Sequence, residues 1–435
     1  MKSLVRTRRP RAVAAATTLT VAIALTACSG GDDGSAADGP VQLRMTTWSS
    51  NEEHQAVLAE IADAYVEAHP DQVSGVEFDA ITDGTYVSAV TTQIAGGDAP
   101  DLMWITESYA EEFVSSGVLA DVGPVFAETE GYDVDDLVPS AMELWRDGEA
   151  IYAYPFSTSP FGVYVNADLL AAAGQPDPRE LIAEDEWTWD RLAEVASATV
   201  AAEDVAGIQL SVDDPYALPN DAITPIGLAW GARPWSEDGT TCAYTSPESV
   251  AFFDWYHTQV YDQRAFPAVG ETVDFAAGQA AFRIGQLSLS AGLGDAFAWD
   301  FVPLPEGPAG AVPVMGQAGI GVLANGEHPD VAADFLAHFT SPENAAKLAA
   351  FFPPPRASLL DVATLREAAP TLTEEQLQDT VIDPAHTATT KVGHPRLSRM
   401  ADTIRASLDA LWDPNADVEA VLADVCAAIE PTLAE

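Results

Sequence analysis

Two short stretches of the chain combine an aromatic ring with hydroxyl, amide or carboxylate groups. Such a mixture can hold a ligand that has both apolar faces and polar groups, because the ring covers an apolar face while the polar side chains exchange hydrogen bonds. A core position would also suit the tryptophan, and the serine before the tyrosine could cap a helix. The candidate side chains are Trp48, Ser49, Asn51, Thr106, Glu107, Ser108 and Tyr109.

Motifs for several catalytic and cofactor-binding classes are missing from the sequence. Beyond Lys2 the lysines are Lys347 and Lys391, and neither follows a glycine or precedes a serine or threonine, so no phosphate-binding loop is present. Residues 319–324 fit a dinucleotide fingerprint formally, but their apolar run predicts a strand where that fingerprint needs a helix. Neither His-Glu-x-x-His nor Gly-x-Ser-x-Gly occurs. We therefore expect no catalytic residue, no metal and no cofactor.

The chain is strongly acidic, with 67 Asp and Glu against 19 Lys and Arg and a net charge of −48. Phosphate backbones would be repelled by such a body, which excludes nucleic acid as a natural partner. Two cysteines, Cys242 and Cys426, stand far from the N-terminus. In an oxidising compartment they could form a disulfide, and two buried free thiols are the alternative.

The N-terminus has the pattern of an export signal. Arginines precede an apolar run at residues 12–27 that is too short to span a bilayer comfortably, so we expect residues 1–27 to be removed. Cys28 follows Leu-Thr-Ala and would become the lipid-carrying first residue, although an ordinary signal peptide with an incidental cysteine is the alternative. The pair Arg8-Arg9 leaves both general and twin-arginine export open. Residues 28–40 are small, polar and acidic, which predicts a flexible tether.

The elements that must position the candidate side chains alternate between strands and helices. The pattern of apolar residues and caps predicts strands at 42–47, 76–81 and 102–105 and helices at 52–68 and 86–95. This alternation is typical of an α/β fold with a mostly parallel sheet. The two candidate stretches follow the first and third strands, at the edge where open α/β sheets bind ligands. A chain of this length exceeds one ordinary core and predicts two lobes.

Several segments resemble one family in order. GGDAPDLMW at 96–104 and SSGVLADV at 115–122 resemble the family 1 extracellular solute-binding proteins, the maltose-binding-protein-like, sugar-capturing subunits of ABC importers. Residues 153–174, 300–305 and 351–358 look like the three places where the chain of this family crosses between lobes. Trp187-Thr188-Trp189-Asp190 opens a helix in a form common in the sugar binders.

The resemblance implies a type II periplasmic-binding-protein-like fold of two α/β lobes joined by a hinge, with the ligand cleft between them. The first lobe would comprise 41–157 and 305–355, and the second 158–304 and 356–435. It also implies a monomer without enzyme activity, anchored to the outside of the cell membrane through its lipid. This monomer would bind a mono- or oligosaccharide and deliver it to permease subunits that work with a separate ATPase subunit.

Further ligand-contacting residues come from the resemblance alone. They lie in the first crossing, in two loops that supply aromatic rings in relatives, in a glycine-containing segment and in the third crossing. Turn chemistry, core packing and a surface salt bridge are the alternative roles. The residues are Thr158, Ser159, Tyr216, Trp230, Gly316, Gln317 and Arg356.

The sequence departs from the family where a tryptophan is expected. Residues 286–288 are Gln-Leu-Ser in place of a Gly-Pro-Trp-like segment, and Met-Gly-Gln at 315–317 replaces a glycine-rich segment that often includes tryptophan. The ligand could therefore be another small polar nutrient, such as a polyol or a polyamine. A lipid-anchored glycoside hydrolase is a further alternative, with two carboxylates drawn from Glu52, Glu53 and Glu107.

Overall fold

The structure is a computed structural model that describes residues 39–81, 86–210, 215–216, 223–268, 270–349 and 351–435. Within it, Pro40–Glu435 form one compact unit. The predicted signal peptide, Cys28 and most of the predicted tether lie outside the described residues. No helix in the described ranges has both the length and the apolar character that crossing a membrane requires.

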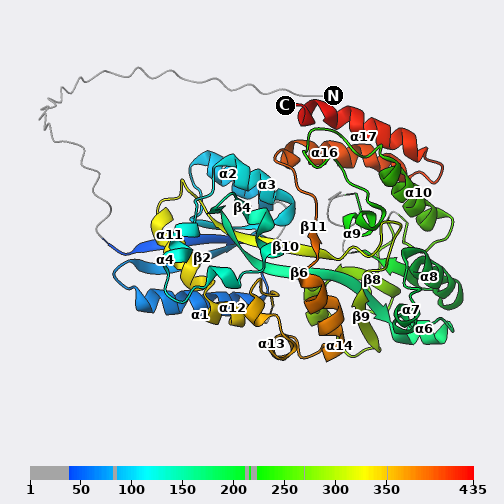
Figure 1. Cartoon of the computed structure of the whole chain (residues 1–435), viewed down its shortest axis with the longest axis horizontal. Coiled ribbons are helices and arrows are strands. Elements are labelled where there is room, and N and C mark those ends of the chain that lie inside the picture. The colour runs from blue at the N-terminus through cyan, green and yellow to red at the C-terminus, as the bar shows by residue number, and fades with distance from the viewer. Residues whose placement is uncertain (1–38, 82–85, 211–214, 217–222, 269, 350) are drawn as a thin grey trace, which may run out of the picture. The chain divides into compact units, whose positions relative to one another are not determined.

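Strands and helices are interleaved along the whole of this unit (Figure 1). The strands are β1 Val41–Thr47, β2 Val73–Ala80, β3 Leu102–Thr106, β4 Arg146–Asp147, β5 Ala150–Ile151, β6 Ala153–Asn166, β7 Ala206–Gln209, β8 Ala280–Gln286, β9 Trp299–Pro303, β10 Val314–Val322 and β11 Thr389–Thr390. The α-helices are α1 Glu52–Ala68, α2 Tyr86–Gly96, α3 Glu107–Ser116, α4 Gly123–Glu128, α5 Pro139–Met142, α6 Ala167–Ala172, α7 Pro178–Ala183, α8 Trp189–Glu203, α9 Thr224–Gly227, α10 Pro247–Tyr261, α11 Pro329–Phe339, α12 Pro342–Leu348, α13 Val362–Ala368, α14 Glu374–Leu377, α15 Asp383–Ala385, α16 Leu397–Leu408 and α17 Val418–Leu433.

The first lobe is built on the strand order β2-β1-β3-β10-β6. β1 runs parallel to β2 and β3, whereas β10 runs antiparallel to β3 and β6. The sheet is therefore mixed, and not mostly parallel as the alternation predicted, because the strands that cross between the lobes pair antiparallel with their neighbours. α1 spans the predicted residues, and its buried face includes Leu58, Ile61 and Tyr65. These side chains share one hydrophobic cluster with Trp104 and Phe335, and this cluster is the core of the first lobe.

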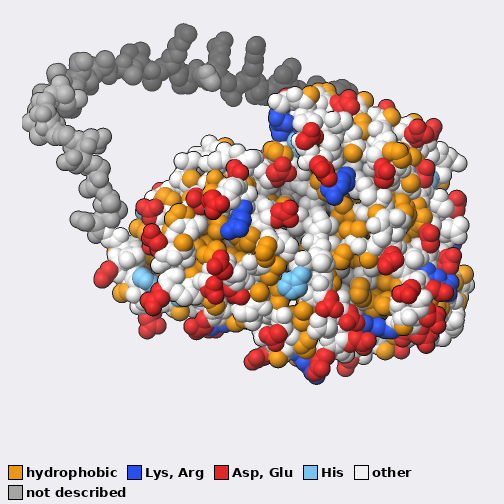
Figure 2. All heavy atoms as spheres, viewed as in Figure 1, with side chains coloured by type: hydrophobic (Ala, Val, Ile, Leu, Met, Phe, Trp, Pro, Cys, Tyr) orange, Lys and Arg blue, Asp and Glu red, His pale blue; other side chains and the backbone are white. Residues whose placement is uncertain are grey.

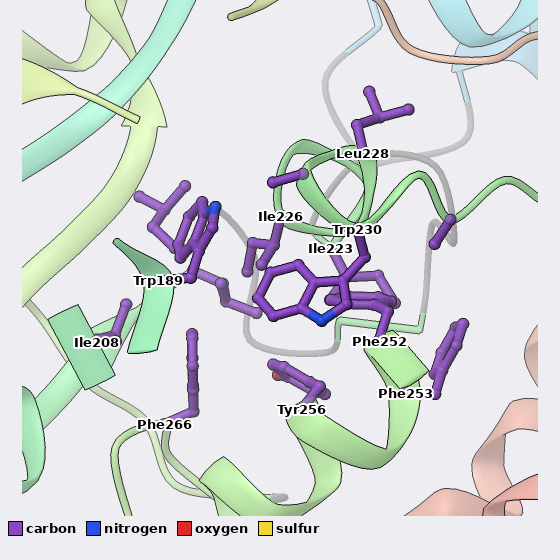
Figure 3. Packing of buried hydrophobic residues seen from close by; sticks show 14 of the residues in the cluster. Trp189, Ile208, Ile223, Ile226, Leu228, Trp230, Phe252, Phe253, Tyr256 and Phe266 are labelled. Carbon is purple, nitrogen blue, oxygen red and sulfur yellow. The ribbon is translucent and has the colours of Figure 1, made fainter. Parts of the chain in front are cut away.

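The second lobe surrounds the far half of β6. There β6 pairs antiparallel with β8 and β9, and β7 pairs parallel with β8. The core is rich in aromatic rings, and Figure 3 shows Trp189, Trp230, Phe252 and Tyr256 packed together from α8, the segment after α9, and α10. α16 and α17 complete this core with apolar faces that include Ile404 and Leu422.

Two long strands carry the chain between the lobes. β6 enters from the first lobe, where Phe156 is buried, and continues to Val163 in the core of the second. β10 returns in the opposite sense, from Val314 in the second core to Ile320 in the first. In Figure 1 both strands lie across the middle of the unit. The segment 300–305, expected as the second crossing, instead lies within the second lobe: its first four residues belong to β9 beside β6, and Val302 and Leu304 are buried in the second core.

Local signals in the sequence set several boundaries. In the segment 187–190, which was expected to open a helix, Thr188 accepts a hydrogen bond from the backbone N–H of Arg191 and caps α8. Ser246 and Ser341 likewise cap α10 and α12, each followed by proline at the first helical position. Residues 319–324 begin inside β10, which confirms that the glycine pattern there belongs to a strand.

Candidate functional site

A cavity of about 790 Å³ is lined by side chains from both lobes. This size lies within the range of about 300–1,000 Å³ common for small-molecule sites. The first lobe and the crossing strands contribute Trp48, Ser49, Ser50, Asn51, His54, Thr106, Glu107, Phe156, Ser157, Gln317, Ala318, Ala349, Phe351, Phe352 and Pro353. The second lobe and the segments joined to it contribute Phe161, Gln286, Leu287, Ser288, Ser290, Ala369, Pro370, Thr371 and Lys391.

One wall of the cavity is aromatic. Trp48, at the end of β1, lies edge-on to Trp104 with ring centres 5.0 Å apart, and its ring centre lies 6.2 Å from that of Phe156. Phe352 meets Phe156 in a T-shaped contact at 5.1 Å. Trp104 is fully buried behind this wall, so it supports the rings that line the cavity. Trp48 therefore combines the two roles considered for it, since it packs on the core and also faces the cavity.

The start of α1 supplies polar groups beside this wall. Asn51 uses its side-chain oxygen to cap the helix, accepting from the backbone N–H groups of Glu53 at 2.9 Å and His54 at 3.0 Å. The Ser49 hydroxyl contacts His54 Nδ1 at 2.9 Å, and the His54 ring packs on Phe351 with centres 4.4 Å apart. Burial lowers the pKa of His54, with the carboxylate of Glu53 acting in the opposite direction. The neutral imidazole is therefore favoured in this wall.

A buried ion pair forms the polar pole of the cavity, by which we mean Glu107, Lys391 and the backbone of Gln317. One carboxylate oxygen of Glu107 pairs with Lys391 Nζ, and the other accepts a hydrogen bond from the Gln317 N–H. Glu107 is the first residue of α3, where the helix dipole favours a negative charge. The Lys391 ammonium also lies 5.4 Å from the centre of the Phe161 ring.

Gln317 and Gly316 help to position other residues of the cavity. The Gln317 side chain accepts from Trp145 Nε1 at 2.9 Å and donates to the Ser140 carbonyl at 3.3 Å. These contacts hold Gln317 in place within β10, where its backbone N–H donates to Glu107. Gly316 lies against Gln286, and a Cβ at this position would come within 1.7 Å of the Gln286 amide nitrogen. A side chain here would displace Gln286 from the cavity lining.

The segment after β8 forms the facing wall. Leu287–Gly292 is a 3-10 helix, and it brings Leu287, Ser288 and Ser290 to the cavity. The Ser288 N–H donates to the hydroxyl of Ser159 at 3.3 Å, which ties this segment to β6. Hydroxyl and amide groups thus occupy the place where the sequence lacks the tryptophan expected from the resemblance.

The structure brings together six of the predicted site residues, whereas Ser108, Tyr109, Thr158, Ser159 and Gly316 are not among the lining residues. Thr158, for example, donates to the carbonyls of Pro353 and Pro354 at 3.0 and 3.2 Å. Tyr216 and Trp230 are 2% and 8% exposed and belong to the second core, so the expectation that they face the cleft is wrong. The six that line the cavity are Trp48, Ser49, Asn51, Thr106, Glu107 and Gln317.

The expectation that Arg356 faces the cleft is also wrong. Its side chain is fully buried and donates to the carbonyls of Asp133 at 3.1 Å and Thr340 at 3.0 Å. The guanidinium also lies 3.5 Å from the carboxylate of Asp136 and over the ring of Tyr132. Arg356 therefore fastens the third crossing to the first lobe, and its stiff proline segment serves the fold.

Sequence reasoning missed Lys391, His54 and the phenylalanines of the cavity. Lys391 could have been noticed by its rarity, since it is one of two lysines beyond the N-terminal segment. Phe156 and Phe352 lie within two of the expected crossings, each next to a proline, so their position near a cleft was a usable signal. Nothing local marks His54, because it faces the cavity only through the packing of α1 against residues 351–352.

Cys242 and Cys426 form a disulfide in the structure, with Cα atoms 5.4 Å apart. Both lie in the second core, and the bond joins the loop before α10 to α17. In the described part of the chain, no three His, Cys, Asp or Glu side chains are grouped in a way that could hold a metal ion.

Solved structures with the same fold are bacterial binding proteins. The substrate-binding protein Lmo0181 of Listeria monocytogenes, in complex with cycloalternan, has a TM-score of 0.77 at 20% identity and covers 91% of this chain and 99% of its own. Maltose-bound T. maritima MalE3 has a TM-score of 0.73 at 19% identity and covers 90% and 99%. UgpB of Mycobacterium tuberculosis, in complex with glycerophosphocholine, has a TM-score of 0.73 at 21% identity and covers 91% and 98%.

Sequence comparison adds a relative and a family. An uncharacterized lipoprotein encoded in the oleD 5′ region of Streptomyces antibioticus is 24% identical over 351 residues, which are 76% of this chain and 74% of that one. The family model described as bacterial extracellular solute-binding protein matches residues 48–346. That match includes parts of both lobes and most of the cavity lining. The chain therefore belongs to the bacterial extracellular solute-binding protein family.

Proposed function

We propose that this protein captures a mono- or oligosaccharide outside the cytoplasm and delivers it to the permease of an ABC importer. The observation that carries the proposal is that one cavity combines the aromatic wall of Trp48 and Phe156 with hydroxyl, amide and ion-pair groups. A sugar presents C–H faces to rings and hydroxyls to donors and acceptors, so it matches both kinds of group. The maltose-bound relative of the same fold supports this ligand class.

Ligand contact with both lobes would favour a closed form over an open one. Because the cavity takes its lining from both sides of the crossing strands, a ligand held there stabilises the arrangement in which the two sides meet. A permease can read this difference between loaded and empty protein. We place the boundaries of the lobes near residues 157 and 356, with β10 as the return passage.

Binding without turnover fits the carboxylates of the cavity. A glycoside hydrolase of the usual kind needs two carboxylates about 5–10 Å apart. Among the described lining residues Glu107 is the only carboxylate, and both of its oxygens have partners in Lys391 and Gln317. This arrangement supports a receptor that makes and breaks no bond. Slow cleavage of a bound oligosaccharide would overturn this part of the proposal.

Location outside the cytoplasm has two lines of support. The disulfide suits an oxidising compartment, and the relative from Streptomyces antibioticus is named a lipoprotein. We propose that residues 1–27 are removed, that Cys28 carries the lipid anchor and that residues 28–40 are the tether. The protein would work as a monomer beside permease subunits and a separate ATPase subunit.

A ligand panel tests the proposed function directly. We expect at least one neutral saccharide, tested among maltose, maltotriose, trehalose and lactose, to raise the melting temperature and to titrate in calorimetry. Trp48→Ala should weaken that binding by about 1–2 kcal/mol, or roughly five- to thirtyfold in Kd, because the wall loses a ring. Trp299→Ala, a partly buried tryptophan outside the lining, is the matched control and should leave Kd unchanged. Binding of a polyol or polyamine in place of every saccharide would overturn the proposal.

The anchor is tested separately. Cys28→Ser should release the protein from washed membranes while leaving saccharide binding intact, because the cavity lies in the folded unit and the anchor lies outside it. Membrane fractionation followed by titration of the released protein provides both readouts. A variant that stays fully membrane-bound would contradict the lipid anchor.

A further inference from the structure

The cavity contains a matched pair of charges within a very acidic protein. Glu107 and Lys391 are the only Asp, Glu, Lys or Arg side chains in the lining described, and they pair with each other. They are 3% and 5% exposed, so neither charge is screened by bulk water as a surface group would be. The whole chain has a net charge of −48, yet its cavity is formally neutral.

Stability alone does not explain a buried ion pair at this place. Desolvating two charges offsets most of their attraction, so a buried pair adds little net stability compared with well-packed apolar residues. This pair is also positioned in detail. The backbone of Gln317 holds the carboxylate, and the ring of Phe161 lies beside the ammonium. Its two members come from different parts of the chain, the start of α3 and the segment directly after β11.

We propose that Glu107 and Lys391 together act as a charge filter that restricts the cavity to uncharged polyhydroxyl ligands. This inference rests on the proposed function and narrows its ligand class. Neighbouring hydroxyls can donate to the carboxylate and accept from the ammonium at once, so a neutral sugar satisfies both groups. Such a filter would reject ions without a steric barrier.

Charged ligands are disfavoured in either sign. A cationic ligand such as a polyamine would compete with Lys391 for Glu107 and leave two positive charges together at a buried site. A phosphate or carboxylate ligand would face the Glu107 charge in the same way. Each ion would also lose its hydration without gaining a net counter-charge, because the filter is already neutral. Discrimination between neutral and charged ligands therefore arises from the pair. Removing one member should leave a net charge in the cavity and favour ligands of the opposite charge.

Three variants separate the members of the filter. Lys391→Met leaves the carboxylate as the only charge, and Glu107→Gln leaves the ammonium as the only charge. The double variant restores a neutral cavity without either ion. Lys347→Met is the matched control, because Lys347 is the other lysine in the described chain and pairs with Glu60 outside the cavity lining. Circular dichroism and melting temperature check that each variant is folded.

The measurement is calorimetric titration of each purified protein with the tightest-binding neutral saccharide of the panel, with spermidine and with glycerol 3-phosphate. We expect the wild type to bind the saccharide alone. Each single variant should lose saccharide affinity by about tenfold or more, because a charged hydrogen-bonding partner is removed. Lys391→Met should then bind spermidine, and Glu107→Gln should bind glycerol 3-phosphate. The double variant should bind neither ion, and Lys347→Met should match the wild type.

The outcomes distinguish the filter from the proposed function. If the wild type binds a saccharide but the single variants still reject both ions, the filter is overturned while the sugar receptor stands. If the wild type binds spermidine or glycerol 3-phosphate and no saccharide, both proposals fail. If one single variant does not fold, the other single variant and the double variant still test the filter, since a different ion selectivity is expected for each of them.

Discussion

Arg356 is a buried side chain that stabilises the fold, although it lies only three positions after Pro353, which lines the cavity. It donates to two backbone carbonyls and lies beside Asp136, with no part of its side chain exposed. Shortening or replacing the guanidinium would remove its hydrogen bonds to both carbonyls and the positive charge beside Asp136. The residue therefore belongs to the network that holds residues 133–136 against the third crossing.

We predict that Arg356→Lys lowers the free energy of unfolding by about 2–3 kcal/mol, because an ammonium cannot reach both carbonyls from a compact head. Saccharide affinity should not change, since the side chain lies outside the cavity. Urea unfolding and calorimetry measure the two quantities. Arg399→Lys, in an exposed ion pair with Glu435, should change stability little and provides the control. A loss of saccharide affinity without a loss of stability would show that Arg356 takes part in ligand binding.

His54 predicts a pH effect with a definite sign. Burial lowers its pKa in the folded protein, while the unfolded value is about 6.5. The folded state therefore disfavours the proton. Its stabilising contribution is complete above the unfolded pKa and is lost as the pH falls through 6.5 toward the folded pKa. We expect unfolding free energy to fall from pH 7.5 to pH 5.5 by more in the wild type than in His54→Asn.

Comparison of the two proteins isolates this residue. Burial also lowers the pKa of His338, but that contribution is common to both and cancels in the difference. Urea unfolding at the two pH values measures it. An equal fall in both proteins would show that His54 does not contribute.

At the scale of elements, the disulfide fastens α17 to the rest of the second lobe. It links cysteines separated by 184 positions, so it closes a long loop in the unfolded chain. We predict that Cys242→Ala with Cys426→Ala lowers stability by about 2–5 kcal/mol, mainly by freeing the unfolded chain. Affinity should stay the same, because both cysteines lie in the second core and outside the cavity.

A reductant provides the internal control for this bond. It should lower the melting temperature of the wild type and leave the double alanine variant unaffected. Intact-mass analysis of alkylated, unfolded protein counts the free thiols in each sample. Two alkylated cysteines in the non-reduced wild type would contradict the bond.

Elements defined by local patterns were predictable from the sequence. α1 has the predicted bounds, and β1, α2 and β3 differ by one residue at an end, because apolar spacing and caps operate within a few residues. β10 was a different case. Its apolar run predicted a strand, yet its place between β3 and β6 depends on pairing with residues far away in the chain. The second crossing was therefore expected too early, at 300–305.

The same distinction applies to the candidate site. Trp48 and Glu107 follow strands that local patterns had located, so their loops could be predicted as ligand-facing. Lys391 reaches the cavity because β11 pairs with Val314 and Met315 of β10, and no short-range signal encodes that pairing. Tyr216 and Trp230 carry rings that suit a core as well as a cleft, and only the packing of the second lobe decides between them.

At the scale of the whole molecule, repulsion among acidic side chains opposes the compact state. Red acidic groups are spread over the face seen in Figure 2, with few basic groups among them. Salt shortens the screening length from about 30 Å at 0.01 M to about 8 Å at 0.15 M. We predict that the melting temperature rises between 0.01 and 0.3 M NaCl at pH 7, because screening relieves this repulsion.

Acid supplies the control for the salt effect. Near the sequence pI of about 4.1 the net charge is small, so added salt should change the melting temperature much less. Scanning calorimetry at both pH values measures the difference. A melting temperature that falls with salt at pH 7 would show that attractive pairs outweigh the general repulsion.

The position of β10 in the first sheet has a consequence for the order of folding. β3 ends at Thr106 and β6 begins at Ala153, but the strand that separates them is not made until Val314–Val322. Until that strand arrives, β3 and β6 each present an unpaired edge. Long-range pairing of this kind is slow, and open edges favour aggregation. In a growing or truncated chain that ends before Val314, the first lobe therefore lacks β10 and the second lobe lacks α16 and α17. The last part of the polypeptide completes both lobes.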